Sequence, residues 1–188
     1  MLKVIEVITK KAFYSLVMFK SKKIRLFNFI IFNIYNMEKT FEISKHSESS
    51  NLTGIQEDVI ENCIQTAINS KINSYSPYSK FRVGAAILTQ DGKIFQGVNV
   101  ENVSYGVCIC AERSGIVSAI SNGSKNFTAV FVTSDLDSFL TPCGACRQVI
   151  AEFDFTWIFL VNCSGQYQVT TIEALLPKPA LINHLKQT

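Results

Sequence analysis

The sequence predicts an α/β fold: a three-layer α/β/α sandwich in which helices cover a mixed sheet of about five strands. Short runs rich in β-branched and aromatic residues alternate with segments of helical apolar periodicity. The chain has 188 residues, of which 47% are hydrophobic and 18% charged, so it can bury a core and is neither disordered nor collagen-like. This order of elements favours right-handed crossovers between the parallel strands.

Residues 1–36 form a basic, apolar extension that differs from the rest of the chain. They contain seven Lys or Arg and one acidic residue, whereas the remaining residues contain 11 basic and 14 acidic side chains. Their longest uncharged stretch, 26–37, is too short to span a bilayer. Two interpretations stay open, a mitochondrial targeting segment or an extension upstream of an ordinary start at Met37.

Polar residues dominate 37–52, which we expect to be a linker, and 53–188 is the expected functional domain. The domain carries no net basic charge, so the composition predicts neither a nucleic-acid partner nor a membrane partner.

The domain is expected to begin with an amphipathic helix over 54–70. Thr53-Gly54-Ile55-Gln56 has the form of a capping box, and apolar side chains recur behind it at helical spacing. Two apolar runs, 81–89 and 93–100, then flank Asp91-Gly92, a dipeptide typical of hairpins. These two runs are therefore predicted to be antiparallel neighbours.

Helices and strands then alternate toward the C-terminus, separated by turn signals such as Asn122-Gly123. The expected elements are a helix over about 110–122, a strand over 129–134, a helix over about 143–153, a strand over 157–162, a strand over 167–170 after Ser164-Gly165, and a short helix over 172–176 that stops before Pro177.

The cysteine spacing is the strongest chemical signal. A disulfide framework is not expected, because no secretion signal is evident and a core of this size needs no cross-links. Cys110-Ala111-Glu112 opens one predicted helix, and Pro142-Cys143-Gly144-Ala145-Cys146 opens another. The starts of two such helices can lie side by side at the carboxyl ends of the strands. Cys143 and Cys146 then project from one face of a first turn, and Cys110 can add a third sulfur.

Three thiolates around Zn²⁺ leave one tetrahedral position open, which is typical of catalytic rather than structural zinc. The positive ends of both helices favour the thiolate form. Glu112 lies in a first turn, where its side chain leans back toward the metal and can act as a general acid and base. We expect Arg113 and Arg147 to donate hydrogen bonds to the sulfurs.

Other interpretations of these residues stay open. Cys143 and Cys146 alone could form a redox pair or half of a structural zinc site. The remaining cysteines, Cys63, Cys108 and Cys163, are expected to be small buried hydrophobic residues. His46 and His184 fall in the linker and the tail and are expected at the surface.

A family resemblance extends this interpretation. Cys110-Ala111-Glu112-Arg113, followed by Pro142-Cys143-Gly144-Ala145-Cys146-Arg147-Gln148, resembles the zinc signature of the small homotetrameric cytidine deaminases. Three further segments resemble the same family and extend the similarity over about 54–177: Tyr75-Ser76-Pro77-Tyr78-Ser79-Lys80-Phe81-Arg82-Val83-Gly84-Ala85-Ala86, Asn99-Val100-Glu101-Asn102 and Glu173-Ala174-Leu175-Leu176-Pro177.

The resemblance implies a homotetrameric hydrolase of pyrimidine salvage that converts cytidine, and deoxycytidine with it, to uridine or deoxyuridine and ammonia. Cysteines that serve as zinc ligands and packing residues instead of forming disulfides predict a reducing compartment, the cytosol. It implies the following roles: Cys110, Cys143 and Cys146 bind one Zn²⁺ per subunit, Glu112 moves protons, Asn99 and Glu101 contact the ribose, Phe81 stacks on the base, the Ala111 backbone faces the base, and Tyr105 reaches a neighbouring subunit's site.

The chain departs from the family pattern at its C-terminal end. Family members carry a Phe a few residues after the Leu-Leu-Pro, but here Pro177 is followed by Lys178-Pro179-Ala180-Leu181. Leu181 is the expected partial substitute for that aromatic side chain.

Alternative functions are a deaminase of another nucleoside-like compound or of a polynucleotide, and a non-catalytic, zinc-stabilised interaction module. The slightly acidic domain disfavours a polynucleotide substrate. A purely structural role also stays open for Phe81, as a core residue, and for Glu101, as a solvated charge in a turn.

Overall fold

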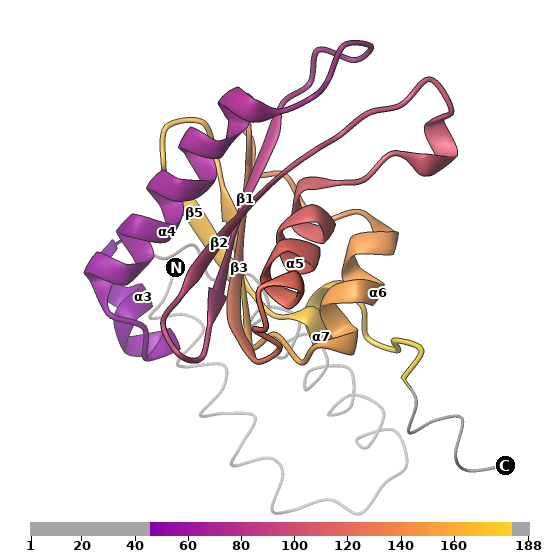
Figure 1. Cartoon of the computed structure of the whole chain (residues 1–188). Helices are drawn as coiled ribbons and strands as arrows, with labels where there is room; N and C mark the ends of the chain where they lie inside the picture. The colour runs from indigo at the N-terminus through magenta and orange to yellow at the C-terminus, as the bar shows by residue number, and fades with distance from the viewer. Residues whose placement is uncertain (1–45, 182–188) are drawn as a thin grey trace, which may run out of the picture. The chain divides into compact units, whose positions relative to one another are not determined.

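A five-stranded sheet of order β2-β1-β3-β4-β5 forms the centre of the protein (Figure 1). The structure is a computed structural model that describes residues 46–181, with side chains from residue 50 onward. Strands β3 and β4 are parallel and the other neighbours antiparallel, so the predicted mixed α/β sheet is confirmed. The strands are β1 (Val83–Thr89), β2 (Ile94–Val98), β3 (Phe127–Ser134), β4 (Trp157–Val161) and β5 (Tyr167–Thr170).

Helices cover both faces of this sheet. Figure 1 shows α3 (His46–Thr53) and α4 (Glu57–Ser70) on one side. The other side carries α5 (Ala111–Ser121), α6 (Gly144–Glu152) and α7 (Ile172–Leu175). Two single-turn 3₁₀ helices, η1 (Lys71–Asn73) and η2 (Tyr105–Val107), interrupt the loops that follow α4 and β2.

Strand β1 shows why its sequence is an unbroken apolar run. Every residue from Val83 to Thr89 is buried. Ala85 and Ile87 pack into the core beneath α5 and α6, whereas Ala86 and Leu88 pack beneath α4. A strand covered on both faces needs apolar residues at successive positions rather than at alternate ones.

The entry to the domain differs from the sequence prediction. Residues 46–53, expected to belong to the linker, form helix α3. The capping box is absent as well, because Gln56 rather than Thr53 is the N-cap of α4. The Thr53 hydroxyl instead accepts a hydrogen bond from the Ile55 backbone N–H in the turn between the two helices.

Residues 1–36, most of the expected linker and His184 fall outside the described residues. Within 46–181, no helix is both long enough and apolar enough to cross a membrane.

Candidate active site

Three cysteine sulfurs converge where α5 and α6 begin. Cys110 is the N-cap of α5 and Cys143 the N-cap of α6, while Cys146 lies in the first turn of α6. The three Sγ atoms lie within 4.8 Å of one another, and those of Cys110 and Cys143 are 3.8 Å apart. Both helix N-termini therefore direct their positive ends toward one group of sulfurs.

This arrangement fits Zn²⁺. Zn–S bonds of about 2.3 Å in tetrahedral geometry place two sulfurs about 3.8 Å apart, which matches the Cys110–Cys143 separation. Within the residues that the structure describes, the cluster contains these three sulfurs as its protein ligands. A three-cysteine donor set leaves the fourth position of a tetrahedral ion for a non-protein ligand.

The thiols of this cluster form hydrogen bonds with one another. A hydrogen bond from Cys146, together with Arg113 and Cys143, lowers the pKa of Cys110 to about 5. The same contact with Cys110, reinforced by burial, raises the pKa of Cys146. These contacts stabilise a thiolate within the cluster, which is the form of cysteine that binds a metal ion.

Glu112 lies in the first turn of α5 and is only 4% exposed. Burial is the main cause that raises the pKa of its carboxyl group, and the charge of Cys110 adds to the shift. A buried carboxyl group whose proton is held more tightly than usual is suited to carry protons during a reaction.

Close packing of α5 against β2 fixes the position of this turn. A Cβ atom added at Gly97 would lie 2.2 Å from the Ala111 carbonyl oxygen and 2.4 Å from the Gly115 nitrogen. The Ser114 hydroxyl also donates to the Val98 carbonyl (2.7 Å) and accepts from the Val98 N–H (2.9 Å). Glycine at position 97 thus lets the helix approach the strand backbone.

The two arginines have different contacts. Arg113 Nη2 lies 3.8 Å from Cys110 Sγ and 3.2 Å from the Cys108 carbonyl, near the expected sulfur. Arg147 does not donate to a sulfur as we expected. Its guanidinium donates instead to the Pro142 and Leu175 carbonyl oxygens and to the Thr141 hydroxyl. It therefore fastens the start of α6 to α7 instead of contacting a sulfur.

A cavity of about 410 Å³ opens directly above the sulfurs, which is large enough for a small-molecule ligand. Cys110, Cys143 and Glu112 line its floor, and Phe81, Asn99 and Glu101 line its walls. Tyr105 lines the cavity as well, so the chain brings together seven of the residues singled out in the sequence. Ala111 lies between two lining residues, but its own side chain is fully buried.

Asn99 and Glu101 organise the wall that carries Phe81. Asn99 accepts hydrogen bonds from Ser74 Oγ (2.6 Å) and the Val83 N–H (2.9 Å), and donates to the Phe81 carbonyl (2.8 Å). Glu101 accepts from the N–H groups of Tyr78 and Ser79 and from the Ser79 hydroxyl. The Ser79 hydroxyl is the main cause that lowers the pKa of Glu101, so this carboxylate is charged at neutral pH.

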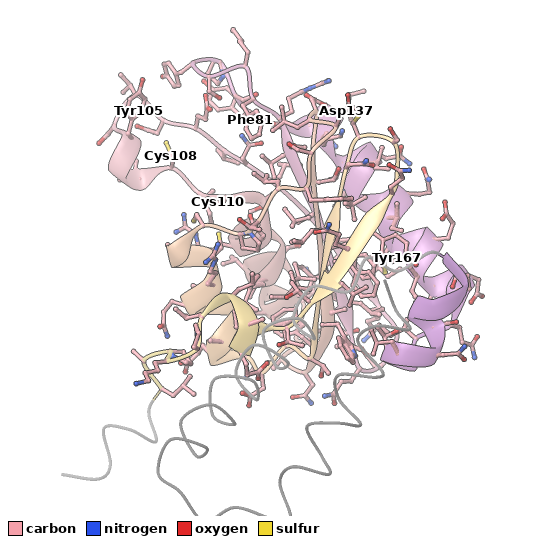
Figure 2. The ribbon with its side chains drawn as sticks, turned by 180° about the vertical axis from the view of Figure 1, so that it is seen from behind. Phe81, Tyr105, Cys108, Cys110, Asp137 and Tyr167 are labelled. Carbon is pink, nitrogen blue, oxygen red and sulfur yellow. The ribbon has the colours of Figure 1, made fainter. Side chains whose placement is uncertain are left out.

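Residues 101–108, which we call the arm, project beyond the sheet (Figure 1). Reciprocal backbone hydrogen bonds between Val100 and Ile109 close its base. Tyr105 lies on the arm with 75% of its surface exposed and meets the Tyr78 ring edge-on at 6.4 Å. Figure 2 shows Tyr105 and Cys108 on the arm, above Cys110. The cavity therefore borders an exposed apolar segment.

Only one of the three remaining cysteines behaves as expected. Cys63 is fully buried beneath the sheet. Cys108 is partly exposed, lines the cavity and accepts the Asn102 N–H. Cys163 is also partly exposed and donates to Asp137. Cys108 is only two positions before the zinc ligand Cys110, and this short spacing could have predicted that Cys108 lies in the cavity wall.

Leu181 does not line this cavity. It packs against the core beneath α5 and α6, and the Gln148 side chain holds the preceding residue through two hydrogen bonds to the Ala180 backbone. The expectation that Leu181 partly replaces the missing aromatic side chain thus finds no support within one chain.

The fold and site define a metal-binding α/β protein with a buried carboxyl group beside a three-cysteine centre. Residues 57–161 match the family described as the cytidine and deoxycytidylate deaminase zinc-binding region. This chain belongs to that family, and its three-cysteine cluster is the zinc-binding site.

Individual proteins show the same similarity. A probable cytidine deaminase from Dictyostelium discoideum is 55% identical over 125 residues, which cover 65% of this chain and 84% of that protein. A cytidine deaminase from Sporosarcina psychrophila is 43% identical over 120 residues, covering 63% and 88%. The crystal structure of cytidine deaminase from Burkholderia pseudomallei superposes with a TM-score of 0.61 at 43% identity, covering 63% of this chain and 97% of that one.

Proposed function

We propose that this chain catalyses the hydrolytic deamination of cytidine and deoxycytidine to uridine or deoxyuridine and ammonia. The observation that carries the proposal is the position of a buried carboxyl group, Glu112, beside three metal-binding sulfurs at the floor of a ligand-sized cavity. An interaction module stabilised by zinc would have no use for this carboxyl group or for the cavity.

Cys110, Cys143 and Cys146 would hold the Zn²⁺, which supplies the Lewis acid that makes water nucleophilic at neutral pH. The Glu112 carboxylate takes a proton from the water that attacks C4 of the base and delivers it to ring N3. Glu112 then transfers the second proton of that water to the departing amino nitrogen. Water and cytidine thereby give uridine and ammonia without a covalent intermediate on the protein.

The hydrogen bonds already formed by Asn99 and Glu101 limit what the wall can recognise. Both acceptor positions of the Asn99 oxygen are occupied, and one N–H of its amide remains. Glu101 has accepted three hydrogen bonds, which leaves about one of its four acceptor positions. One donor and one acceptor suit a single hydroxyl group. If that group is the ribose 3′-hydroxyl, deoxycytidine is a substrate as well.

Phe81 supplies the remaining contact that a nucleoside needs. Its ring packs partly against the core and partly lines the cavity, so one face of the ring can stack on a pyrimidine. The proposal thus gives Phe81 both roles considered from the sequence, that of a core residue and that of a stacking residue.

The arm suits contact with a second copy of the chain. Val103, Tyr105 and Val107 are each at least two-thirds exposed, so the arm presents large apolar side chains to solvent. We place these side chains against a neighbouring subunit of a homotetramer, where Tyr105 would border that subunit's cavity. Sedimentation equilibrium at micromolar concentration tests this, and a monomeric wild-type protein would contradict it.

A panel of substrates followed by ultraviolet absorbance tests the proposed reaction. Cytidine and deoxycytidine should both be deaminated, with kcat/KM values within roughly tenfold of each other, because they share the 3′-hydroxyl. 3′-Deoxycytidine should be at least about 100-fold poorer, because it leaves the wall's polar groups unpaired. CMP and a single-stranded oligonucleotide complete the panel. Activity on the oligonucleotide alone would overturn the proposal.

A further inference from the structure

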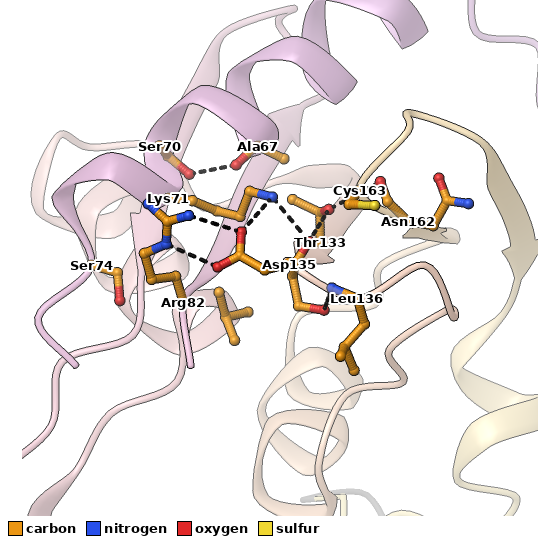
Figure 3. A network of polar contacts seen from close by, with 12 residues as sticks. Ala67, Ser70, Lys71, Ser74, Arg82, Thr133, Asp135, Leu136, Asn162 and Cys163 are labelled. Carbon is orange, nitrogen blue, oxygen red and sulfur yellow. Dashed lines mark hydrogen bonds and ion pairs between the residues drawn. The ribbon is translucent and has the colours of Figure 1, made fainter. Parts of the chain in front are cut away.

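Three charged side chains, Lys71, Arg82 and Asp135, form a cluster (Figure 3), and none of them lines the cavity. Arg82 precedes β1 and Asp135 follows β3. These two strands are antiparallel with Val83 opposite Ser134, so the two side chains meet. Arg82 Nε lies 2.9 Å from Asp135 Oδ2, and its Nη2 lies 3.3 Å from Oδ1. This bidentate geometry fixes orientation as well as distance.

Lys71 holds the same carboxylate from the opposite side. Its Nζ lies 3.1 Å from Asp135 Oδ1 and donates to the Ser134 carbonyl at 2.9 Å, while its side chain is only 10% exposed. The contact with Arg82, followed by that with Lys71, lowers the pKa of Asp135. The carboxylate is therefore charged at neutral pH and separates two cations that would otherwise repel each other.

Each charged residue of this cluster belongs to a segment that continues into a wall of the cavity. Arg82 is flanked by Phe81 and Val83, which both line it. Lys71 belongs to η1, just before Ser74, whose hydroxyl binds Asn99. Beyond Asp135, residues 140, 141 and 143 line the cavity and include a zinc ligand. The cluster thus joins the wall that faces the base to the segment that delivers Cys143.

The Asp135 side of the cluster is firmly anchored. The Leu136 carbonyl accepts the Cys163 N–H at 3.0 Å, and the Asp137 carbonyl accepts the Asn162 side-chain amide at 3.3 Å. The Phe81 side is held by a separate set of contacts: Asn99 donates to the Phe81 carbonyl at 2.8 Å, and the Phe81 N–H donates to Ser79 Oγ at 3.0 Å. Lys80, immediately before it, has a φ of 59°, a left-handed conformation that costs free energy in a residue other than glycine. The ion pair therefore links this strained segment to the separately anchored Asp135 segment.

We infer that Arg82 and Asp135 are positioning residues that hold the Phe81 ring in register with the three-cysteine site. The inference rests on the proposed function, since it concerns the wall that would receive the base. Asp135 acts through Arg82 and contacts no substrate. Removing its charge frees Arg82 from the anchored segment and lets Phe81 move, while leaving the sulfurs and Glu112 in place.

The test compares Asp135→Asn, Arg82→Gln and the double variant in the full-length chain. Asp91→Asn is the matched control, because it removes an exposed carboxylate that pairs with Lys93 (2.7 Å) at the opposite end of β1. Cytidine kinetics, calorimetric binding of uridine, zinc content and hydrogen exchange of residues 78–83 are measured for each variant.

For Asp135→Asn we expect KM for cytidine and Kd for uridine to rise roughly tenfold, with kcat within about twofold and zinc content unchanged. Exchange of residues 78–83 should accelerate by a similar factor. Arg82→Gln should have a smaller effect. The double variant should recover part of the Asp135→Asn loss, because Lys71 no longer faces a second unneutralised cation.

Unchanged exchange and unchanged uridine binding in both single variants would overturn the inference. A loss of binding that follows loss of zinc would overturn it too, because the cluster would then support the metal site instead of Phe81. If Asp135→Asn fails to fold, Arg82→Gln decides alone, since that arginine is half-exposed. A wild-type protein that neither binds uridine nor deaminates cytidine refutes the proposed function, and hydrogen exchange still decides the positioning role.

Discussion

Replacing Gly97 with Ala tests whether the packing of α5 on β2 sets the catalytic geometry. The added Cβ would lie 2.2 Å from the Ala111 carbonyl oxygen, whereas ordinary van der Waals contact begins at 3.4 Å. The helix or strand must therefore retreat by about 1.2 Å, the difference between these distances. Both contacted groups are backbone, so no flexible side chain can absorb the movement.

The displaced turn carries Cys110 and Glu112, and Cys143 belongs to a different helix. A shift of this size should lower the free energy of unfolding by about 1–3 kcal/mol, as overpacking of a tight core does. Misplacement of reacting groups by about 1 Å costs on the order of 100-fold in rate, so we expect kcat/KM for cytidine to fall by about that factor. Zinc should also be lost more readily to a chelator.

Thermal unfolding, zinc content and cytidine absorbance are measured on Gly97→Ala and on Gly144→Ala. The second variant is the control, because a Cβ at the first residue of α6 meets no atom within 4 Å. Gly144→Ala should match the wild type. A Gly97→Ala protein with wild-type stability and rate would refute the claim that close packing of helix on strand sets the site.

Three further predictions concern the cysteines and the metal. Burial raises the pKa of Cys63 to about 12, so at pH 8 the folded protein should resist alkylation there while the partly exposed Cys108 reacts; mass spectrometry showing rapid modification of Cys63 would contradict its burial. Arg147→Gln removes the hydrogen bonds to the Pro142 and Leu175 carbonyls, so zinc affinity measured by chelator competition should fall roughly tenfold, and an unchanged affinity would exclude this supporting role. Chelation should lower the unfolding temperature, and Zn²⁺ but not Mg²⁺ should restore it, because thiolates favour zinc.

The sheet was predictable because its strands carry simple local signals. Asp91-Gly92 marks the β1–β2 hairpin, and the buried run 83–89 has the composition of a strand covered on both faces. The start of β1 was not predictable. The apolar run begins at residue 81, but the strand begins at Val83, because Phe81 lines the cavity and Arg82 pairs with Asp135. Helix α3 has few apolar residues in a periodic pattern, so no local signal predicts it.

The metal site was predictable because short-range spacing dictates it. Cys143 and Cys146 share the first turn of one helix, and Glu112 shares the first turn of another with its N-cap, Cys110. Contacts between segments far apart in the sequence have no comparable local pattern that predicts them. Lys71 and Ser134 are 63 positions apart, and Arg147 finds its acceptor on Leu175, 28 positions away. These partners follow from the sheet order rather than from local spacing.

Glu112→Gln tests the central claim most directly, because glutamine has nearly the same shape but cannot carry the proton. We predict that this variant folds, retains one equivalent of Zn²⁺ and loses cytidine deamination by at least about 100-fold, the range that general acid–base catalysis contributes. Retained zinc combined with near-wild-type loss of cytidine absorbance would contradict the proposed role of Glu112 and the mechanism built on it.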